Sequence, residues 1–374
     1  MTSTPIIGFD AKRIVRNGTG LGSYGRTLVN DLAKFPLRIH LYAPDEGRDN
    51  LRSQVTGTEN VSLHTPHDRF LRGAYWRTHG IINDLKHDGV QLYHGLSGEL
   101  PIGIRKSGIP AVVTIHDLIF LRHPEFYHPI DVQIYKWKFR QTIKEASNII
   151  AISECTKRDI LEYGGDIVSE DKITLIYQSC SPRFNVSNNS LPSHSLINAK
   201  RYILSVGSIE PRKNTMLALK ALRYLPDDIS LVLVGRHTTY TDKLSDYAQA
   251  NGLEHRLIVL HGVSDHELPA IYSGAEAFVY PSVYEGFGIP IIEAISCGLP
   301  VVACTGSCLE EAGGPDSLYV STDDVEGMAD AIRRSLRGTE GREIRIQRSM
   351  DYIKRFAGND VAGQVYELYK QLLP

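Results

Sequence analysis

Cysteine is scarce in this chain of 374 residues, and its few cysteines follow no paired spacing. The five positions are Cys155, Cys180, Cys297, Cys304 and Cys308. No C-x-x-C occurs, and an odd number of cysteines without a disulfide framework is typical of a reducing cytosol. Because free cysteine behaves as a small apolar residue, we expect these side chains to be buried rather than to carry chemistry.

The chain also lacks long apolar runs and any strong excess of charge. No apolar run reaches the ~18 residues that a membrane-spanning helix needs, and the N-terminal stretch MTSTPIIGFD has neither region of a signal peptide. Lys and Arg number 41 against 43 Asp and Glu, which argues against nucleic acid as a partner. We therefore expect a globular, cytoplasmic protein, and its length suits two domains.

Short apolar, β-branched runs alternate with helical patterns along the chain, as in IIGF, AVVTI, ISLVLVG and PVVAC. Nearly continuous apolar strands between helices indicate parallel sheets covered on both faces. A stretch rich in Ser, Asn and Pro separates two such halves. The pattern predicts two doubly wound, Rossmann-like domains, 1–180 and 200–350, with a linker at 181–199 and a helical tail at 351–374. Ligands of such sheets bind beyond the carboxyl ends of the strands, so a cleft between the sheets is the expected site.

Near the N-terminus the stretch GLGSYG, which begins at Gly20, spells G-x-G-x-x-G between a predicted strand and a helical pattern. Three interpretations are open: a dinucleotide loop with Asp45 as its ribose-binding acid, a loop for another phosphate ligand, or a plain turn. The ten residues 11–20 follow the strand. They favour a longer loop and count against a dinucleotide site, whose turn follows its strand directly.

The strongest signal is the stretch VYPSVYEGFGIPIIEAISCGLPVVA, which predicts a strand at 277–280, a loop to Gly288 and a helix to Cys297. Glu285 falls in the loop and Glu293 in the first helical turn. The glycines allow a ligand to approach the backbone, and the helix start offers unpaired N–H groups to an anion. Two carboxylates beside an anion site fit a nucleotide sugar, because its hydroxyls donate to carboxylates while amides bind its phosphates. Solvated glutamates at a helix start are the alternative.

A second polar cluster follows the strand YILSVG, which ends at Gly207. Arg212 and Lys213 precede a helix that is predicted to begin near Asn214, with the asparagine as its cap. Two cations after a strand could neutralise a diphosphate. An exposed basic pair is the alternative.

In the N-terminal half, His116 and Asp117 follow the apolar strand AVVTI. A histidine there could donate to a sugar or phosphate oxygen, and a structural His–Asp pair is the alternative. His94 and Glu99 lie in LYHGLSGELP, where we expect them beyond another strand. With Asp117 they are candidates for acceptor binding, and a structural role is the alternative.

The segment RFLRGAYWRTHGIINDLK mixes the arginines Arg69, Arg72 and Arg77 with aromatic residues such as Phe70 and Trp76. It could contact anionic lipid headgroups or hold an acceptor. A partly buried helix with a solvated basic face is the favoured interpretation.

Together these motifs resemble family 4 of the retaining glycosyltransferases, which have the GT-B fold, and the resemblance covers nearly the whole chain. It is carried by TIHDL, AISECTKRDI, VGSIEPRKN, VSDHELPAIYSGAEAFVYPS and EGFGIPIIEAISCGLPVVA. The resemblance implies two Rossmann-like domains that face a central cleft, with the tail crossing back to the N-terminal domain. It also implies a retaining hexosyltransferase of bacterial surface polysaccharide or lipopolysaccharide synthesis.

The same resemblance implies a role for each candidate residue. Glu285 would touch the transferred sugar, and His116 would lie at the reaction centre. Arg212 and Lys213 would bind the donor diphosphate, and Glu293 would bind the donor ribose. The remaining donor-binding positions would be Gly20, Gly22, Gly207, Gly286, Phe287 and Gly288.

The expected reaction moves a hexose from a nucleotide diphosphate to an acceptor hydroxyl, with retention. The resemblance to polysaccharide mannosyltransferases implies GDP-mannose as the donor, with UDP-glucose as the second candidate. No residue in the sequence reads the base unambiguously. The expected acceptor is a glycan or a lipid-linked glycan, and peripheral contact with the membrane stays open. No convincing D-x-D motif stands at a strand end, so neither a metal nor another cofactor is expected. A nucleotide-sugar epimerase and a non-catalytic nucleotide-sugar sensor are the alternatives.

Overall fold

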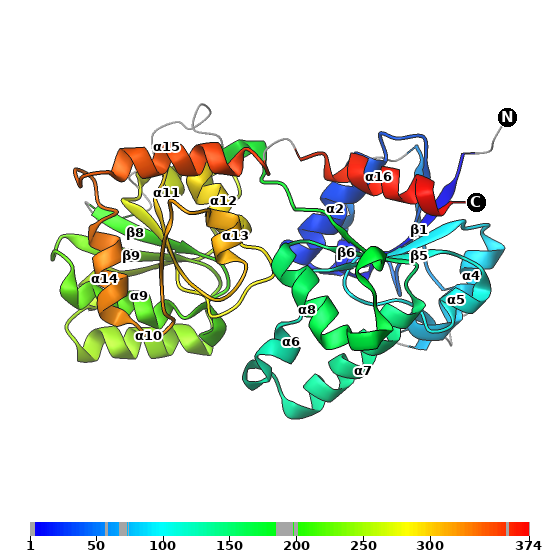
Figure 1. Cartoon of the computed structure of the whole chain (residues 1–374), viewed down its shortest axis with the longest axis horizontal. Coiled ribbons are helices and arrows are strands. Elements are labelled where there is room, and N and C mark those ends of the chain that lie inside the picture. Colours follow the sequence, from blue (N-terminus) through cyan, green and yellow to red (C-terminus); the bar gives the residue numbers. More distant parts are fainter. Residues whose placement is uncertain are drawn as a thin grey trace. The chain divides into compact units, whose positions relative to one another are not determined.

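The computed structural model describes residues 4–56, 59–66, 73, 75–184, 197, 201–356 and 359–373. The chain forms two compact units (Figure 1). Unit 1 comprises Met1–Tyr177 and Asp360–Pro374, and unit 2 comprises Gln178–Asn359. Of the linker that the sequence predicts, residues 185–196, 198 and 199 lie outside the described part of the chain.

Unit 1 is built on a seven-stranded sheet in which neighbouring strands run parallel. The strands are β1 (Ile6–Asp10), β2 (Arg38–Tyr42), β3 (Val61–His64), β4 (Leu92–Gly95), β5 (Ala111–Ile115), β6 (Asn148–Ala151) and β7 (Ile173–Leu175). Their spatial order, β3-β2-β1-β4-β5-β6-β7, reverses direction between β1 and β4, which is the switch point of a doubly wound fold. Every residue of β4, β5 and β6 is buried, as expected for apolar runs covered on both faces.

Helices cover both faces of this sheet. They are α1 (Lys12–Arg16), α2 (Gly20–Leu32), α3 (Asp49–Arg52), the π-helix η2 (Trp76–Gly80), α4 (Ile81–His87), α5 (Ile104–Ser107), α6 (Ile119–Arg122), η3 (Pro124–Phe126), α7 (Pro129–Glu145), α8 (Glu154–Gly164), η4 (Gly165–Ile167), η5 (Glu170–Lys172) and α16 (Val361–Leu372). On one face α2 and α16 bury Leu28 and Val365 in a shared core with β1 and β2. On the other face α4 and α7 bury Leu85 and Ile143 in a second core.

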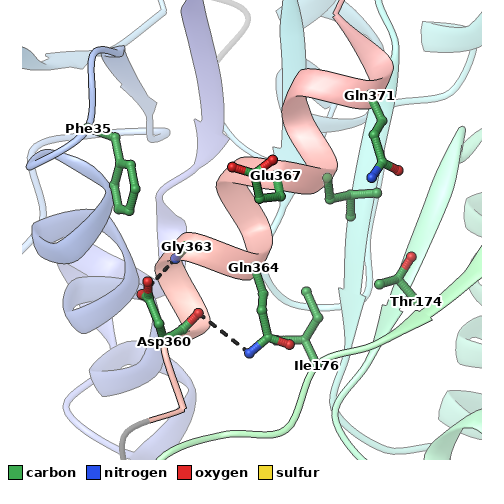
Figure 2. A pocket seen from close by; sticks show the side chains of 9 residues that line it. Phe35, Thr174, Ile176, Asp360, Gly363, Gln364, Glu367 and Gln371 are labelled. Atoms are coloured by element: carbon green, nitrogen blue, oxygen red, sulfur yellow. Dashed lines mark hydrogen bonds between the residues drawn. The ribbon is translucent and has the colours of Figure 1, made fainter.

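The C-terminal helix α16 belongs to unit 1, although it follows unit 2 in the chain. Its Tyr369 is fully buried, and the ring of Tyr366 lies 4.7 Å from that of Phe35. A groove of about 490 Å³ lies between α16 and β7, and Thr174 and Gln364 are among its lining residues (Figure 2). None of the residues predicted for the site lines this groove.

Unit 2 repeats the same plan with a six-stranded parallel sheet. The strands are β8 (Arg201–Val206), β9 (Ile229–Val234), β10 (Leu257–Leu260), β11 (Ala277–Tyr280), β12 (Val301–Cys304) and β13 (Leu318–Val320). The helices are η6 (Pro182–Phe184), η8 (Pro211–Lys213), α9 (Thr215–Ala221), η9 (Leu222–Tyr224), α10 (Thr239–Ala250), η10 (Glu254–Arg256), α11 (Leu268–Gly274), α12 (Ile289–Ser296), α13 (Leu309–Gly313), α14 (Val325–Arg333) and α15 (Arg342–Ile353). The order β10-β9-β8-β11-β12-β13 puts the switch point of unit 2 between β8 and β11.

The sequence predicts that the second domain ends at residue 350, but this residue falls inside α15, and unit 2 ends at Asn359. Helix α15 packs against α12 and α13, and the Tyr352 hydroxyl donates to the Glu311 carbonyl at 2.9 Å. These contacts keep the chain in unit 2 as far as Asn359.

Candidate active site

The two cations after β8 and the glutamate after β11 meet at the switch point of unit 2. Lys213 Nζ lies 2.6 Å from a carboxylate oxygen of Glu285, and the Arg212 guanidinium lies 3.0 Å from the same oxygen. Arg212 also donates to the Tyr284 carbonyl at 2.7 Å and pairs with Glu210. The sequence predicted these groups as separate clusters, and the parallel pairing of β8 with β11 brings them together.

This cluster is partly buried, with side chains 12–17% exposed, and its Lys213–Glu285 pair is charged at neutral pH. Burial alone would raise the pKa of Glu285, but the charges of Lys213 and Arg212 outweigh it and hold that pKa below its usual range. Burial acts against the charge of Lys213, and Glu285 more than compensates, so the pKa of the lysine is raised. Arg212 and Lys213 therefore already form ion pairs with carboxylates. A bound diphosphate would share these two cations with Glu285 and Glu210.

The strand end at Gly207 shapes the backbone around Lys213. Gly207 has a φ of 141°, a region that favours glycine. Gly207, Lys213 and Tyr280 line one small cavity, and Lys213 Nζ donates to the Tyr280 hydroxyl at 2.7 Å. Asn214 stands at the helix start as predicted, but its side chain does not cap α9. It donates instead to the Thr322 carbonyl at 2.8 Å.

The glycine-rich loop before α12 can offer a ligand its backbone groups rather than side chains. Gly288 has a φ of 108°, and an added Cβ would lie 3.3 Å from Ala312 and Leu309 of α13. The Cys308 thiol donates to the carbonyls of Glu285 and Phe287, at 3.1 and 2.9 Å. The Phe287 side chain is only 3% exposed, so this residue can offer a ligand little besides its backbone.

Glu293 is the fifth residue of α12, just past the first helical turn in which the sequence predicted it. The Tyr272 hydroxyl donates to its carboxylate at 3.0 Å. Burial raises the pKa of Glu293 to about 7. This carboxyl group therefore titrates in the physiological range, unlike Glu285.

The G-x-G-x-x-G stretch forms the start of a helix and not the predicted loop, and its role in binding the donor stays a prediction. Helix α2 already begins at Gly20. A Cβ at Gly22 would lie 1.8 Å from the Asn17 carbonyl oxygen, and one at Gly25 would lie 2.9 Å from Ile14. Two of the glycines are thus needed for close packing of α2 against α1, whereas Gly20 faces open space.

His116 follows β5 as predicted and is half-buried. Its Nε2 lies 3.0 Å from the Leu96 carbonyl, and the Tyr24 ring meets it edge-on at 4.8 Å. Burial lowers the pKa of His116 to about 4, so the imidazole is neutral at pH 7. The Asp117 carboxylate accepts from the Ile119 N–H at 3.2 Å, which caps α6 locally.

His94 does not lie beyond its strand, and this corrects the predicted acceptor site. It is part of β4 and is fully buried. Its ring nitrogens lie 2.6 Å from the Tyr369 hydroxyl and 2.8 Å from the Thr114 hydroxyl. Burial lowers the pKa of His94 to about 3, so it is a neutral core residue that ties α16 to the sheet.

Glu99 belongs to a charged cluster at the switch point of unit 1. Arg77 donates to Glu99 at 3.2 Å and to Asp10, at the end of β1, at 2.7 Å. Lys138 of α7 donates to Glu99 at 2.9 Å. Lys12, which follows β1, is partly buried, and burial followed by the charge of Arg77 lowers its pKa. Sequence reasoning missed Asp10 and Lys12, although Asp10 ends the first strand and Lys12 begins the helix that follows it.

The described part of the basic, aromatic segment agrees with the favoured interpretation, a partly buried helix. Trp76 is 2% exposed and donates from its indole to Asp84 at 2.7 Å. Arg77 is held by its ion pair with Asp10. Arg69, Phe70 and Arg72 lie outside the described residues.

Among the described residues, one cluster in unit 1 offers three metal-ligating groups within 4.8 Å of one another: His40, His64 and Asp88. Both ring nitrogens of His64 are already engaged, by Asp88 at 3.1 Å and by the Ser62 hydroxyl at 2.7 Å. The Tyr42 hydroxyl also donates to Asp88. We assign no ion to this network, and metal independence of the activity stays a prediction.

The fold defines a class of protein. The whole chain matches the crystal structure of a glycosyltransferase from Rickettsia africae ESF-5 with a TM-score of 0.76. The match covers 100% of this chain and 99% of that chain at 17% sequence identity. The predicted fold class is confirmed: two doubly wound parallel-sheet units of the GT-B type.

Sequence comparison identifies the family. The family described as "Glycosyltransferase Family 4" matches residues 18–181, and "Glycosyl transferases group 1" matches residues 187–350. The chain is 31% identical over 290 residues to O-antigen chain mannosyltransferase B of Escherichia coli, covering 75% of this chain and 74% of that protein. It is 28% identical over 371 residues to O-antigen chain mannosyltransferase RfbU of Salmonella typhimurium strain LT2, covering 96% of each. The chain belongs to glycosyltransferase family 4 and is a hexosyltransferase-type enzyme. Within the described residues, no helix is long and apolar enough to cross a membrane.

Proposed function

We propose that this enzyme transfers mannose from GDP-mannose to a hydroxyl of a glycan or lipid-linked glycan, with retention and without a metal. The observation that carries the proposal is the partly buried ion-paired cluster of Arg212, Lys213 and Glu285 at the switch point of unit 2. The names of the Escherichia coli and Salmonella relatives support mannose as the sugar and an O-antigen polysaccharide as the product. UDP-glucose is the second candidate donor.

The cluster suits a nucleotide sugar because it presents both signs of charge. Arg212 and Lys213 would neutralise the diphosphate, and Glu285 would accept from hydroxyls of the sugar. Backbone N–H groups at Gly286, Phe287 and Gly288 would add donors to the oxygens of the donor.

Glu293 would bind the ribose, since its carboxylate can accept from both ribose hydroxyls. Tyr272 already orients this carboxylate, with its hydroxyl 3.0 Å away. Gly20 and Gly207 would allow backbone to approach the donor. The close contact between Gly22 and Asn17 makes a direct donor role for Gly22 unnecessary.

In the proposed reaction the bond between the anomeric carbon and the diphosphate oxygen breaks, and the acceptor oxygen bonds to that carbon on the same face. The acceptor proton passes to the departing diphosphate, whose added negative charge Arg212 and Lys213 stabilise. His116 would contact the transferred sugar as a neutral imidazole, because its pKa lies near 4.

The charged cluster around Glu99 in unit 1 is a better candidate for the acceptor-binding site than His94, which is buried in the core. Glu99 and Asp10 offer carboxylate oxygens at the carboxyl ends of adjacent strands, where doubly wound sheets bind ligands. Lys12 and Lys138 would favour an acceptor that also carries phosphate. We also propose that Asp117 contributes to acceptor binding.

The test is a donor screen by calorimetry with GDP-mannose, UDP-glucose, UDP-galactose and UDP-N-acetylglucosamine, followed by acceptor profiling by mass spectrometry. We expect one donor to bind at least about tenfold more tightly than the others. Preference for a UDP-sugar would overturn the donor assignment and leave the family intact. Nucleoside diphosphate release only with an acceptor would exclude an epimerase, and tight binding without any turnover would favour a sensor.

A further inference from the structure

One side chain of the G-x-G-x-x-G stretch contacts a residue of the proposed site. Tyr24 is the fifth residue of α2 and stands between Gly22 and Gly25. Its ring meets the imidazole of His116 edge-on, with 4.8 Å between the ring centroids and 86° between the ring planes. The glycine-rich stretch therefore reaches His116 through a side chain, independently of what its backbone does for the donor.

Gly25 determines how closely α2 approaches the residues around His116. A Cβ at this position would lie 2.9 Å from Ile14 of α1 and 3.4 Å from Leu96. Leu96 is the residue whose carbonyl oxygen lies 3.0 Å from Nε2 of His116. The absence of a side chain at Gly25 therefore lets α2 pack closely enough for Tyr24 to reach the imidazole.

The Leu96 carbonyl determines the tautomer of His116 but not the orientation of its ring. A carbonyl oxygen only accepts, so Nε2 carries the proton of the neutral imidazole and Nδ1 is the acceptor. One hydrogen bond at one corner of the ring does not by itself prevent rotation about the N–H···O axis. A perpendicular ring at 4.8 Å opposes that rotation, because aromatic pairs favour the edge-on arrangement. Tyr24 therefore supplies the constraint that this hydrogen bond lacks.

Buried polar groups support the Tyr24 side chain. Burial raises the pKa of Tyr24 to about 12, and a hydrogen bond with Thr114 acts against that rise. Thr114 is fully buried in β5, and its hydroxyl lies 2.8 Å from Nε2 of His94. Nδ1 of His94 in turn lies 2.6 Å from the Tyr369 hydroxyl of α16. Because water does not reach these groups, each depends on its neighbours for hydrogen bonds, and the network holds Tyr24 in place beside His116.

We propose that Tyr24 is a positioning residue for His116, and that its ring holds the imidazole in the orientation that the transfer step needs. The inference rests on the proposed function in one respect, namely that His116 contacts the transferred sugar. In the proposed function, donor affinity comes mainly from the cluster of Arg212 and Lys213 in unit 2. Loss of the Tyr24 ring should therefore lower turnover and leave donor binding nearly unchanged.

The test compares Tyr24→Leu, which removes the ring, with Tyr24→Phe, which keeps the ring and removes only the hydroxyl. Turnover is measured with GDP-mannose and methyl α-mannoside, and donor affinity by calorimetry with GDP-mannose. Tyr24→Leu should lower kcat about three- to tenfold, the size expected for loss of one aromatic pair, with less than about a twofold change in donor affinity. Tyr24→Phe should keep kcat within about twofold of the parent. Phe35→Leu is the matched control, because Phe35 packs against the same core as Tyr24, and it should keep the parental kcat.

A double-mutant cycle tests whether Tyr24 acts through His116. In the His116→Ala background, Tyr24→Leu should have no further effect on kcat, because no imidazole is left to orient. An equal loss in both backgrounds would overturn the inference and leave the proposed function standing. A parental kcat for Tyr24→Leu in an enzyme that needs His116 would do the same. Parental turnover of His116→Ala would overturn the proposed role of His116 and this inference together.

Nitrogen NMR of protein with isotope-labelled histidine provides a measurement that needs no substrate. The His116 signals, assigned by their loss in His116→Ala, should show a single tautomer with the proton on Nε2. Tyr24→Leu should give a mixture of tautomers, because an imidazole that turns loses its bond to the Leu96 carbonyl, and Tyr24→Phe should keep the single form. An unchanged single tautomer in Tyr24→Leu would overturn the inference. If GDP-mannose gives no turnover, the donor assignment falls, and the NMR result still decides whether Tyr24 positions His116.

Discussion

The raised pKa of Glu293 makes a quantitative prediction about donor binding. Burial raises this pKa to about 7 in the free enzyme, so about half of the carboxyl groups are protonated at neutral pH. The ionised carboxylate can accept from both ribose hydroxyls and accepts more strongly than the protonated form, so donor binding should favour release of a proton from Glu293. The affinity for the donor should therefore rise with pH and level off above the pKa.

The magnitude follows from the ionised fraction. With a pKa near 7, that fraction is roughly a tenth at pH 6 and nine tenths at pH 8, so affinity should be about tenfold higher at pH 8. The diphosphate of a nucleotide sugar is esterified at both ends and does not titrate in this range. His116 does not interfere either, because its pKa lies near 4.

The assay is calorimetry with GDP-mannose from pH 5.5 to 8.5 in two buffers of different ionisation enthalpy. The Glu293→Gln variant keeps the size of the side chain and a carbonyl acceptor, so its affinity should vary little with pH. A flat profile for the parent enzyme, or the same slope in the variant, would refute the role of Glu293.

The pH dependence of the free energy of unfolding provides an independent check on the ionisation of Glu293. A carboxyl pKa raised from its usual value destabilises the folded state as pH rises from about 4.5 to 7, because the unfolded chain ionises first. Glu293→Gln should therefore stabilise the free protein at pH 8, by about 1–3 kcal/mol in urea unfolding. It should have little effect at pH 4.5. Equal effects at both pH values would show that ionisation of Glu293 is not responsible.

Four further predictions concern other parts of the site and the fold. Lys213→Ala should weaken donor binding about ten- to hundredfold in calorimetry, because a charge-assisted bond contributes roughly 1.5–3 kcal/mol. Lys220→Ala, at an exposed position, is the control. Equal donor affinities for the two variants would contradict the role of Lys213. His116→Ala should lower kcat about a hundredfold with a much smaller change in donor affinity, and normal turnover would return His116 to a structural role. Activity should survive EDTA, and loss that magnesium or manganese restores would contradict metal independence. His94→Ala should destabilise unit 1 by about 3 kcal/mol in urea unfolding, because it leaves the Tyr369 and Thr114 hydroxyls unpaired. A change below about 0.5 kcal/mol would contradict that account.

Much of the fold follows from local sequence pattern. Runs such as AVVTI and NIIAI are apolar at successive positions, and only strands buried on both faces tolerate that pattern. Turn residues marked the loop that carries Glu285, with Gly288 and Pro290 at the start of α12 as predicted. These signals are readable because each depends on neighbouring residues.

Where the sequence misled, packing against another element decided the role of the residue. Gly22 resembles a ligand-loop glycine, but its lack of a side chain is required by the Asn17 carbonyl of the preceding helix. His94 sits near a strand end by pattern, and only the return of α16 places Tyr369 against it, 275 positions away. No periodicity within β4 carries that information.

By itself, the sequence determined the parallel α/β architecture, the family, and the residue types that we propose to surround a nucleotide sugar, because these depend on short-range pattern and on motifs. Only the tertiary structure decided which charges meet. Lys213 and Glu285 are 72 positions apart and form one partly buried ion pair because β8 and β11 are neighbours at the switch point. The same holds for Arg77, Asp10 and Glu99, which three separate segments bring together. Burial and charge pairing depend on distances in space, and those distances are set by the packing of whole elements rather than by the residues on either side.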